Sequence, residues 1–282
     1  MKKIMMIMAA AVIAVAAQAE VKFAYEAGAE VVTAYLWRGQ LNGGLSFQPD
    51  LEVGFDTENT GLRVGTWISI GASDWQFKTN AAEKENNTFF IPEVDLMANY
   101  SFYGATVGLT YYQLFNYNAY DKKYDPYYQL EVTAGYNFGD LLNFPLYINW
   151  NTMVAGDDDN VTVDVDPNTG EETESAKRAW SSYLEVGYDH SFPYDITLGG
   201  KVGMSPWKSG LYGNDRFAVV NVSVRLQKDW DLDVCQLSLF AEGAINPYGV
   251  RQDKNSVFIN KAGMEKVYCQ TMNGTIGLGV WF

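Results

Sequence analysis

The chain has 282 residues, of which 15% are aromatic and 26 are glycine, and its formal net charge is −14. Because nucleic-acid binding requires a basic surface, this charge argues against a nucleic-acid partner. The mean hydropathy is −0.16, and beyond residue 19 no run of about twenty apolar residues occurs, which argues against membrane-spanning helices.

The first nineteen residues are predicted to be a cleaved secretory signal peptide. Lys2 and Lys3 form a basic start, an apolar stretch follows from Ile4, and Ala17-Gln18-Ala19 has the A-x-A form of a cleavage site. A buried N-terminal helix is the alternative, but the charge, the length and the cleavage site all favour export. We therefore expect a signal peptide at 1–19 and a single domain at 20–282.

The rest of the chain is a series of segments in which every second residue is apolar, a pattern typical of strands with one apolar face. Twelve such segments can be assigned from the sequence. They are 32–36, 51–55, 62–70, 94–100, 105–111, 128–136, 146–154, 184–188, 196–204, 218–226, 237–241 and 276–282. The first is assigned outward-facing Val32, Ala34 and Leu36, and the tenth outward-facing Ala218 and Val220, among others.

The connectors between these segments alternate in length. Those near Glu58, Phe102, Asp140, Pro193 and Asp229 are mostly short, and those at 73–88, 156–177 and 246–267 are long and polar. Short periplasmic turns, long external loops and an even strand number are typical of bacterial transmembrane barrels. The sequence thus predicts an all-β, antiparallel up-and-down transmembrane barrel of about twelve strands. A soluble β-sandwich is the alternative, because it alternates in the same way.

The last segment, 276–282, ends the given sequence on an aromatic residue. Ile276, Leu278, Val280 and Phe282 share one face of an extended strand, and Gly277, Gly279 and Trp281 share the other. This pattern resembles the terminal signature of bacterial outer-membrane barrels. The resemblance implies that the barrel-assembly machinery reads Gly279, Val280, Trp281 and Phe282, and that the protein resides in the outer membrane of a Gram-negative cell.

A second resemblance covers about forty residues, from Thr33 to Ile70. This stretch contains Trp37-Arg38-Gly39, then Gln48, then Gly61, Gly65 and Trp67 in a Gly-x-x-x-Gly-x-Trp hairpin. It resembles the start of the TorF-like porin family. The resemblance implies a porin-like outer-membrane barrel and no catalytic residues.

The residues between the apolar positions should point into the barrel, and many of them are charged. The pore-lining candidates are Glu52, Arg63, Glu93, Asp95, Glu131, Glu185, Lys201, Arg225 and Glu242. Acids outnumber bases among them, so a wet lumen should favour cations. Glu52 with Arg63, and Glu185 with Lys201, are predicted to be diagonal cross-strand pairs. The alternative is that these charges fill a closed lumen.

Few other motifs indicate chemistry. Inward-facing Tyr112, Tyr147, Tyr183 and Phe240 could offer stacking surfaces to a solute or simply fill the interior. The acidic stretch from Asp164 fails the EF-hand pattern, because Gly170 is one place late and Ser175 replaces the required Glu. His190, the single histidine, lacks a G-x-S-x-G context. No enzyme activity, metal or cofactor is therefore predicted.

The sequence as a whole predicts an outer-membrane channel for passive diffusion of small hydrophilic solutes, with a preference for cations. Its partners would be the lipid bilayer, the barrel-assembly machinery and the solutes themselves. The alternative is a closed structural or adhesive barrel whose acidic external loops bind a partner. A barrel hydrolase that uses His190 is a third hypothesis.

Overall fold

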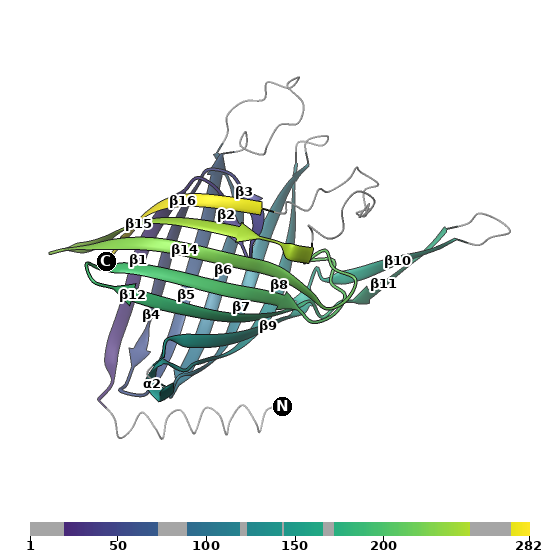
Figure 1. Cartoon of the computed structure of the whole chain (residues 1–282). Coiled ribbons are helices and arrows are strands. Elements are labelled where there is room, and N and C mark those ends of the chain that lie inside the picture. Colours follow the sequence, from purple (N-terminus) through teal and green to yellow (C-terminus); the bar gives the residue numbers. More distant parts are fainter. Residues whose placement is uncertain (1–19, 73–88, 119–122, 143, 166–171, 249–271) are drawn as a thin grey trace.

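The structure, a computed structural model, describes residues 20–72, 89–118, 123–142, 144–165, 172–248 and 272–282, so the predicted signal peptide lies outside the described residues. Twelve strands close into one antiparallel barrel in the order β1-β16-β15-β14-β13-β12-β9-β8-β7-β6-β5-β4 (Figure 1), which confirms the predicted all-β fold and strand number. The barrel strands are β1 (Lys22–Val32), β4 (Ser46–Asp56), β5 (Thr60–Ala72), β6 (Phe89–Phe102), β7 (Ala105–Asn118), β8 (Lys123–Asn137), β9 (Leu146–Gly156), β12 (Ser182–Phe192), β13 (Ile196–Ser205), β14 (Ala218–Leu232), β15 (Cys235–Ile245) and β16 (Met272–Trp281).

The remaining elements lie at the two ends of the barrel. At one end, the turn end, short connectors join β4 to β5, β6 to β7, β12 to β13 and β14 to β15, and the short helix α2 (Gly139–Leu142) joins β8 to β9. At the opposite end, the hairpin β10 (Asp159–Val165) and β11 (Glu172–Arg178) projects away from the barrel (Figure 1). The hairpin β2 (Tyr35–Trp37) and β3 (Gln40–Gly43) joins β1 to β4 at that same end.

The barrel wall has an apolar outer face and a largely polar inner face. Large apolar side chains at alternate positions are exposed on the outside, for example Leu51, Leu96 and Leu278, whereas Gln48, Asp95 and Ser238 are buried. Such an inverted distribution is unstable in water but stable in a lipid bilayer. None of the described residues forms a helix long and apolar enough to cross a membrane.

The first strand differs from the prediction in both position and facing. β1 covers Lys22–Val32 and so lies before most of the predicted segment 32–36. Val31 is 47% exposed on the outer face, whereas Val32 is 4% exposed on the inner face. The reason is that the apolar stretch 32–36 does not continue the wall, because the chain leaves it after Val32 and Leu36 belongs to β2. Assigning outward positions to Val32, Ala34 and Leu36 was wrong.

The start of β14 also differs from the prediction. A bulge shifts the register between β13 and β14, so that Gly203 pairs with Asn221 but Met204 pairs with Val219. Because a one-residue shift moves side chains to the other face, Ala218 and Val220 are buried in a cluster rather than exposed. Their predicted outward orientation was wrong, whereas Val224 and Leu226 beyond the bulge are exposed as predicted.

Candidate functional site: the barrel interior and its inner hairpin

The β2–β3 hairpin turns tightly at Arg38 and Gly39. Both residues have positive φ, 50° and 78° respectively, and Trp37 pairs directly with Gln40. Positive φ at both central residues defines the type I′ turn that suits a two-residue hairpin. The turn places Arg38 at the tip, where its side chain contacts residues from the barrel wall.

Arg38 forms a buried, two-pronged ion pair with Glu131 of β8. Its Nη1 lies 2.7 Å from one carboxylate oxygen of Glu131 and its Nη2 lies 2.7 Å from the other. The Tyr112 hydroxyl donates to the same carboxylate at 3.0 Å, and Arg38 Nη1 also donates to the Tyr212 hydroxyl. Burial raises the pKa of the Tyr212 phenol, which therefore stays neutral. A fork-to-fork geometry of this kind is the strongest form of side-chain ion pair.

Aromatic rings enclose the guanidinium of Arg38. Its Cζ lies 4.5 Å from the ring centre of Trp37 and 4.8 Å from that of Tyr183. The Trp37 ring stacks on Tyr212 with centres 5.9 Å apart. Tyr183 and Tyr212 belong to a buried cluster with Ala218, Val220 and Tyr248. The hairpin tip is thus buried among aromatic rings that hold its guanidinium.

The hairpin backbone is held from the other side of the barrel. Asn273 of β16 donates its side-chain amide to the Gly39 carbonyl at 2.8 Å. A β-carbon at Gly39 would lie 2.4 Å from Asn221 Oδ1 of β14, so only glycine fits there. Since the tip contacts β8, β12, β14 and β16, the hairpin crosses the interior and narrows it.

Besides Glu131, five of the predicted lining residues form ion pairs: Glu52, Arg63, Lys201, Arg225 and Glu242. Arg63 Nη1 lies 3.3 Å from Glu52, as predicted, and Arg63 also pairs with Asp56. Lys201 Nζ lies 3.7 Å from Glu242. Glu185 and Lys201 lie diagonally across the β12–β13 pair, as predicted, but among the described residues no ion pair joins them.

Glu185 instead accepts hydrogen bonds from two phenols. Tyr147 donates to one carboxylate oxygen at 3.3 Å and Tyr183 donates to the other at 3.0 Å. Glu185 and Asp189 line a cavity of about 380 Å³ near the turn end of the barrel. The inward orientation predicted for Tyr147 and Tyr183 agrees with these contacts.

Arg225 packs against an aromatic ring and pairs with an acid that the sequence analysis missed. Its Cζ lies 3.5 Å from the ring centre of Phe240, and its Nη2 lies 3.4 Å from Glu30 of β1. Glu30 was missed because it has the same parity as Val32, Ala34 and Leu36, which were assigned to the outer face.

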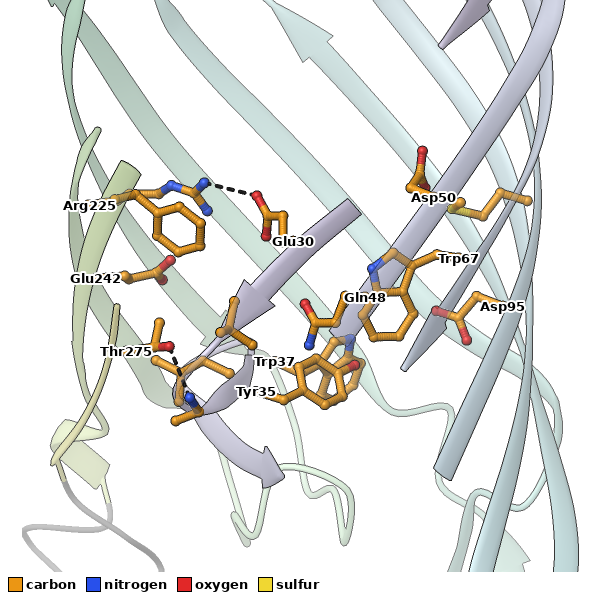
Figure 2. A pocket seen from close by; sticks show the side chains of 15 residues that line it. Glu30, Tyr35, Trp37, Gln48, Asp50, Trp67, Asp95, Arg225, Glu242 and Thr275 are labelled. Atoms are coloured by element: carbon orange, nitrogen blue, oxygen red, sulfur yellow. Dashed lines mark hydrogen bonds and ion pairs between the residues drawn. The ribbon is translucent and has the colours of Figure 1, made fainter. Parts of the chain in front are cut away.

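The last two predicted lining residues, Glu93 and Asp95 of β6, are buried on the inner face. No described basic residue forms an ion pair with either of them. Asp95 lines a second cavity of about 310 Å³, which lies between the hairpin and the wall (Figure 2). The interior therefore keeps two water-accessible spaces and a surplus of acids.

Arg38 is the main functional residue that the sequence analysis did not place. The motif Trp37-Arg38-Gly39 was noted, but the role of its arginine depends on a hairpin that folds into the interior. An Arg-Gly pair flanked by short apolar stretches was the available signal for a type I′ turn.

The proposed assembly signal forms the end of β16. Trp281 points inward over Gly28, where a β-carbon would lie 2.1 Å from the indole ring. Val280 and Phe282 lie on the opposite, outward face with Leu278. The geometry matches the predicted alternation, and the role in assembly stays a prediction.

His190 lies near the end of β12, next to the short connector to β13. His190 contacts aromatic residues there, with its Nδ1 3.3 Å from the Tyr188 hydroxyl and its ring packed on Phe192. No group of three or more His, Cys, Asp or Glu among the described residues could hold a metal ion.

Comparison with known proteins gives matches only among solved structures. No family model and no curated protein matches the chain, so membership of the TorF-like family stays a prediction. The chain is similar to the COG4313 outer membrane channel from Pseudomonas putida F1, with 11% identity and a TM-score of 0.46 over 93% of this chain and 94% of that one. It is also similar to Salmonella typhi OmpF in complex with daunomycin, with 10% identity and a TM-score of 0.32 over 94% and 97%. At these values neither similarity bears on function.

Proposed function

We propose that this protein is an outer-membrane channel through which small hydrophilic solutes diffuse passively, with a preference for cations. The observation that carries the proposal is a closed barrel with an apolar outer face and a charged, partly hollow interior. A soluble barrel or sandwich would bury its apolar face rather than its charges. The predicted signal peptide at 1–19 supports export, and the C-terminal pattern supports insertion into the outer membrane.

The hairpin β2–β3 sets the size of the solutes. Its tip reaches β8, β12, β14 and β16, and residues of the hairpin line one of two cavities found within the described part of the barrel. Cavities of about 310 and 380 Å³ are at the small end of ligand-sized spaces. The proposed solutes are accordingly small.

The preference for cations follows from the charges of the inner face. Arg63, Lys201 and Arg225 each have an acidic partner, whereas Glu93, Asp95 and Glu185 have no described basic partner. Since a pore selects ions by the sign of its lining charges, the surplus acids favour cations.

The alternative, a closed barrel with a structural or adhesive role, is favoured by the packing around Arg38. A guanidinium enclosed by Glu131, Trp37, Tyr183 and Tyr212 is characteristic of a fixed core rather than a moving gate. On this alternative the external loops would carry the function.

Liposome swelling separates the two proposals. Residues 20–282 refolded into liposomes should admit small sugars and amino acids, and the rate should fall as solute size rises. A barrel that is folded by gel mobility and β-rich by circular dichroism, yet admits no solute and carries no current, would contradict the channel.

Neutralising inner-face acids tests the charge preference. The variant Glu52→Gln, Glu93→Gln, Asp95→Asn should conduct with a reduced preference for cations. Glu131 is left intact because it holds Arg38. The matched control neutralises three exposed acids of the turn end, Glu58→Gln, Asp231→Asn and Asp233→Asn, and should keep most of the preference. Equal selectivity in the two variants would contradict selection by the inner face.

A further inference from the structure

The cavity between the hairpin and the wall combines aromatic rings with carboxylates. Figure 2 shows Tyr35, Trp37 and Trp67 beside Asp50 and Asp95, with Glu30, Arg225 and Glu242 on the other side. We infer that this cavity binds a small organic ammonium cation, which its carboxylates hold by charge and its aromatic rings by their faces. This inference rests on the proposed channel function, because it names the class of solute that would bind inside the barrel.

Strand register places a tryptophan between two acids. Trp67 of β5 pairs directly with Asp50 of β4 on one side and with Asp95 of β6 on the other. All three side chains line the cavity. Directly paired residues have β-carbons about 5 Å apart, so both carboxylates lie near the indole ring.

Asp95 provides an observation that is independent of the cluster. The residue is only 8% exposed, and its Oδ1 has no hydrogen-bond partner in the described part of the chain. A buried carboxylate oxygen without a partner costs free energy, and a cation held nearby in the cavity lowers that cost through its charge. Neither Asp95 nor Asp50 forms an ion pair with a described residue. The cavity thus offers unneutralised acceptors on this wall.

The opposite wall does not offer a free positive charge. Arg225 lies 3.4 Å from Glu30 and also donates to Gln227, so its charge is already matched. Glu242 lines the cavity as well and lies 3.7 Å from Lys201. The cavity is therefore acidic overall, and it disfavours anions.

The aromatic rings select an organic cation over a bare metal ion. Tyr35 of the hairpin lies against Trp67 with ring centres 5.2 Å apart, so both rings border the space beside the acids. Tryptophan and tyrosine faces attract alkylated ammonium groups, which shed their water readily. A cavity of about 310 Å³ suits a ligand with about ten heavy atoms or fewer.

Isothermal titration calorimetry of the refolded barrel in a maltoside detergent tests the inference, with choline as the probe. Its neutral isostere 3,3-dimethyl-1-butanol has the same shape without the charge. Choline should bind, the isostere should bind at least about tenfold more weakly, and Asp95→Asn should weaken choline binding about tenfold. Trp67→Leu should weaken it several-fold.

The matched controls are Asp231→Asn and Trp230→Leu, which change the same residue types at the exposed turn end and should leave choline binding unchanged. Equal binding of choline and its isostere, or no choline binding by the folded barrel, would overturn the inference. If Asp95→Asn does not fold, the comparison of the two probes on the unmodified protein decides alone.

Conductance of the same preparation in potassium chloride distinguishes a failure of the proposed binding site from a failure of the proposed channel function. A barrel that conducts but does not bind choline overturns the binding site and leaves the channel. A barrel that binds choline but carries no current overturns the channel and leaves the site.

Discussion

Arg38 is the residue that makes the most contacts between the inner hairpin and the barrel wall. It donates to Glu131 and Tyr212 and lies over the rings of Trp37 and Tyr183. Taking both charges of such a pair out of water is costly, and removing only one partner is costlier because the other stays buried and unpaired. The pair therefore fixes the position of the hairpin more than it stabilises the fold.

Arg38→Ala should leave the Glu131 carboxylate buried without its partner and release the hairpin tip. We expect a loss of about 3–5 kcal/mol in the free energy of unfolding, together with a larger single-channel conductance. Urea-dependent unfolding in detergent and bilayer recording measure the two effects. Arg216→Ala is the control, because that arginine is largely exposed and should change neither quantity. An unchanged stability in Arg38→Ala would contradict the role given to the pair.

Gly39→Ala tests whether the tip of the β2–β3 hairpin packs against Asn221 of the barrel wall. The residue has a φ of 78°, and a β-carbon there would lie 2.4 Å from Asn221 Oδ1. Left-handed backbone at a residue with a side chain costs on the order of 1–3 kcal/mol, and the close contact adds to it. Gly210→Ala has open space around it and should shift the urea midpoint little. Equal urea midpoints for the two variants would contradict the close contact between Gly39 and Asn221.

At this scale the sequence predicted the inner-face charges and the pair of Glu52 with Arg63, but not the partners of Lys201, Arg225 and Arg38. A period of two is sufficient to separate inward from outward residues, so Glu52, Arg63 and Asp95 could be placed. The pairing of Lys201 with Glu242, and of Arg38 with Glu131, depends on side-chain reach across several strands. No local pattern contains that information.

The β2–β3 hairpin is the element that distinguishes this barrel from a plain cylinder. It leaves the wall after Val32 and returns at Ser46, and these two residues face each other across the β1–β4 pair. The wall would therefore remain continuous without the hairpin. Its contribution is to narrow the interior and to supply Tyr35 and Trp37.

Replacing residues 34–45 with a four-residue Gly-Ser linker should leave the barrel folded and raise its conductance several-fold. The register between Val32 and Ser46 lets a short linker close the strands. Circular dichroism and bilayer recording provide the test. A control that replaces the hairpin strands 159–178, which project away from the barrel, should keep the original conductance. A lower conductance after removal of the inner hairpin would contradict its role as the constriction.

Two element-level predictions failed for one physical reason. The alternation at 32–36 and at 218–220 is real, but in the first case the chain bends inward and in the second a bulge reverses the faces. The alternation of apolar and polar residues predicts which side chains face inward only where the pairing between strands is regular. Both departures occur at the end of the barrel opposite the short turns, where the interior is packed.

The barrel as a whole has apolar side chains on its outer face and charged side chains on its inner face. The count of twelve strands was predictable because each strand of the barrel repeats the same alternation between turn signals. Most contacts between side chains in the interior were not predictable, because the residues that meet there come from strands far apart in the sequence.

The lipid-facing surface yields a direct test of membrane insertion. Leu96 is 53% exposed on the outer face of β6, and Val234 is 78% exposed in a turn. Leu96→Arg should cost about 2–4 kcal/mol of folding free energy in vesicles, and Val234→Arg about 0–1 kcal/mol, because only the first places a charge in hydrocarbon. Urea titrations in lipid vesicles measure both. Similar small costs would indicate that the outer face meets water.

The reversal potential of residues 20–282 in a planar bilayer, under a potassium chloride gradient, tests the central claim most directly. The surplus of inner-face acids predicts a steady current whose reversal potential has the sign of cation selectivity. A reversal potential of the opposite sign would contradict the proposed lining. A verifiably folded barrel that carries no current at all would contradict the channel.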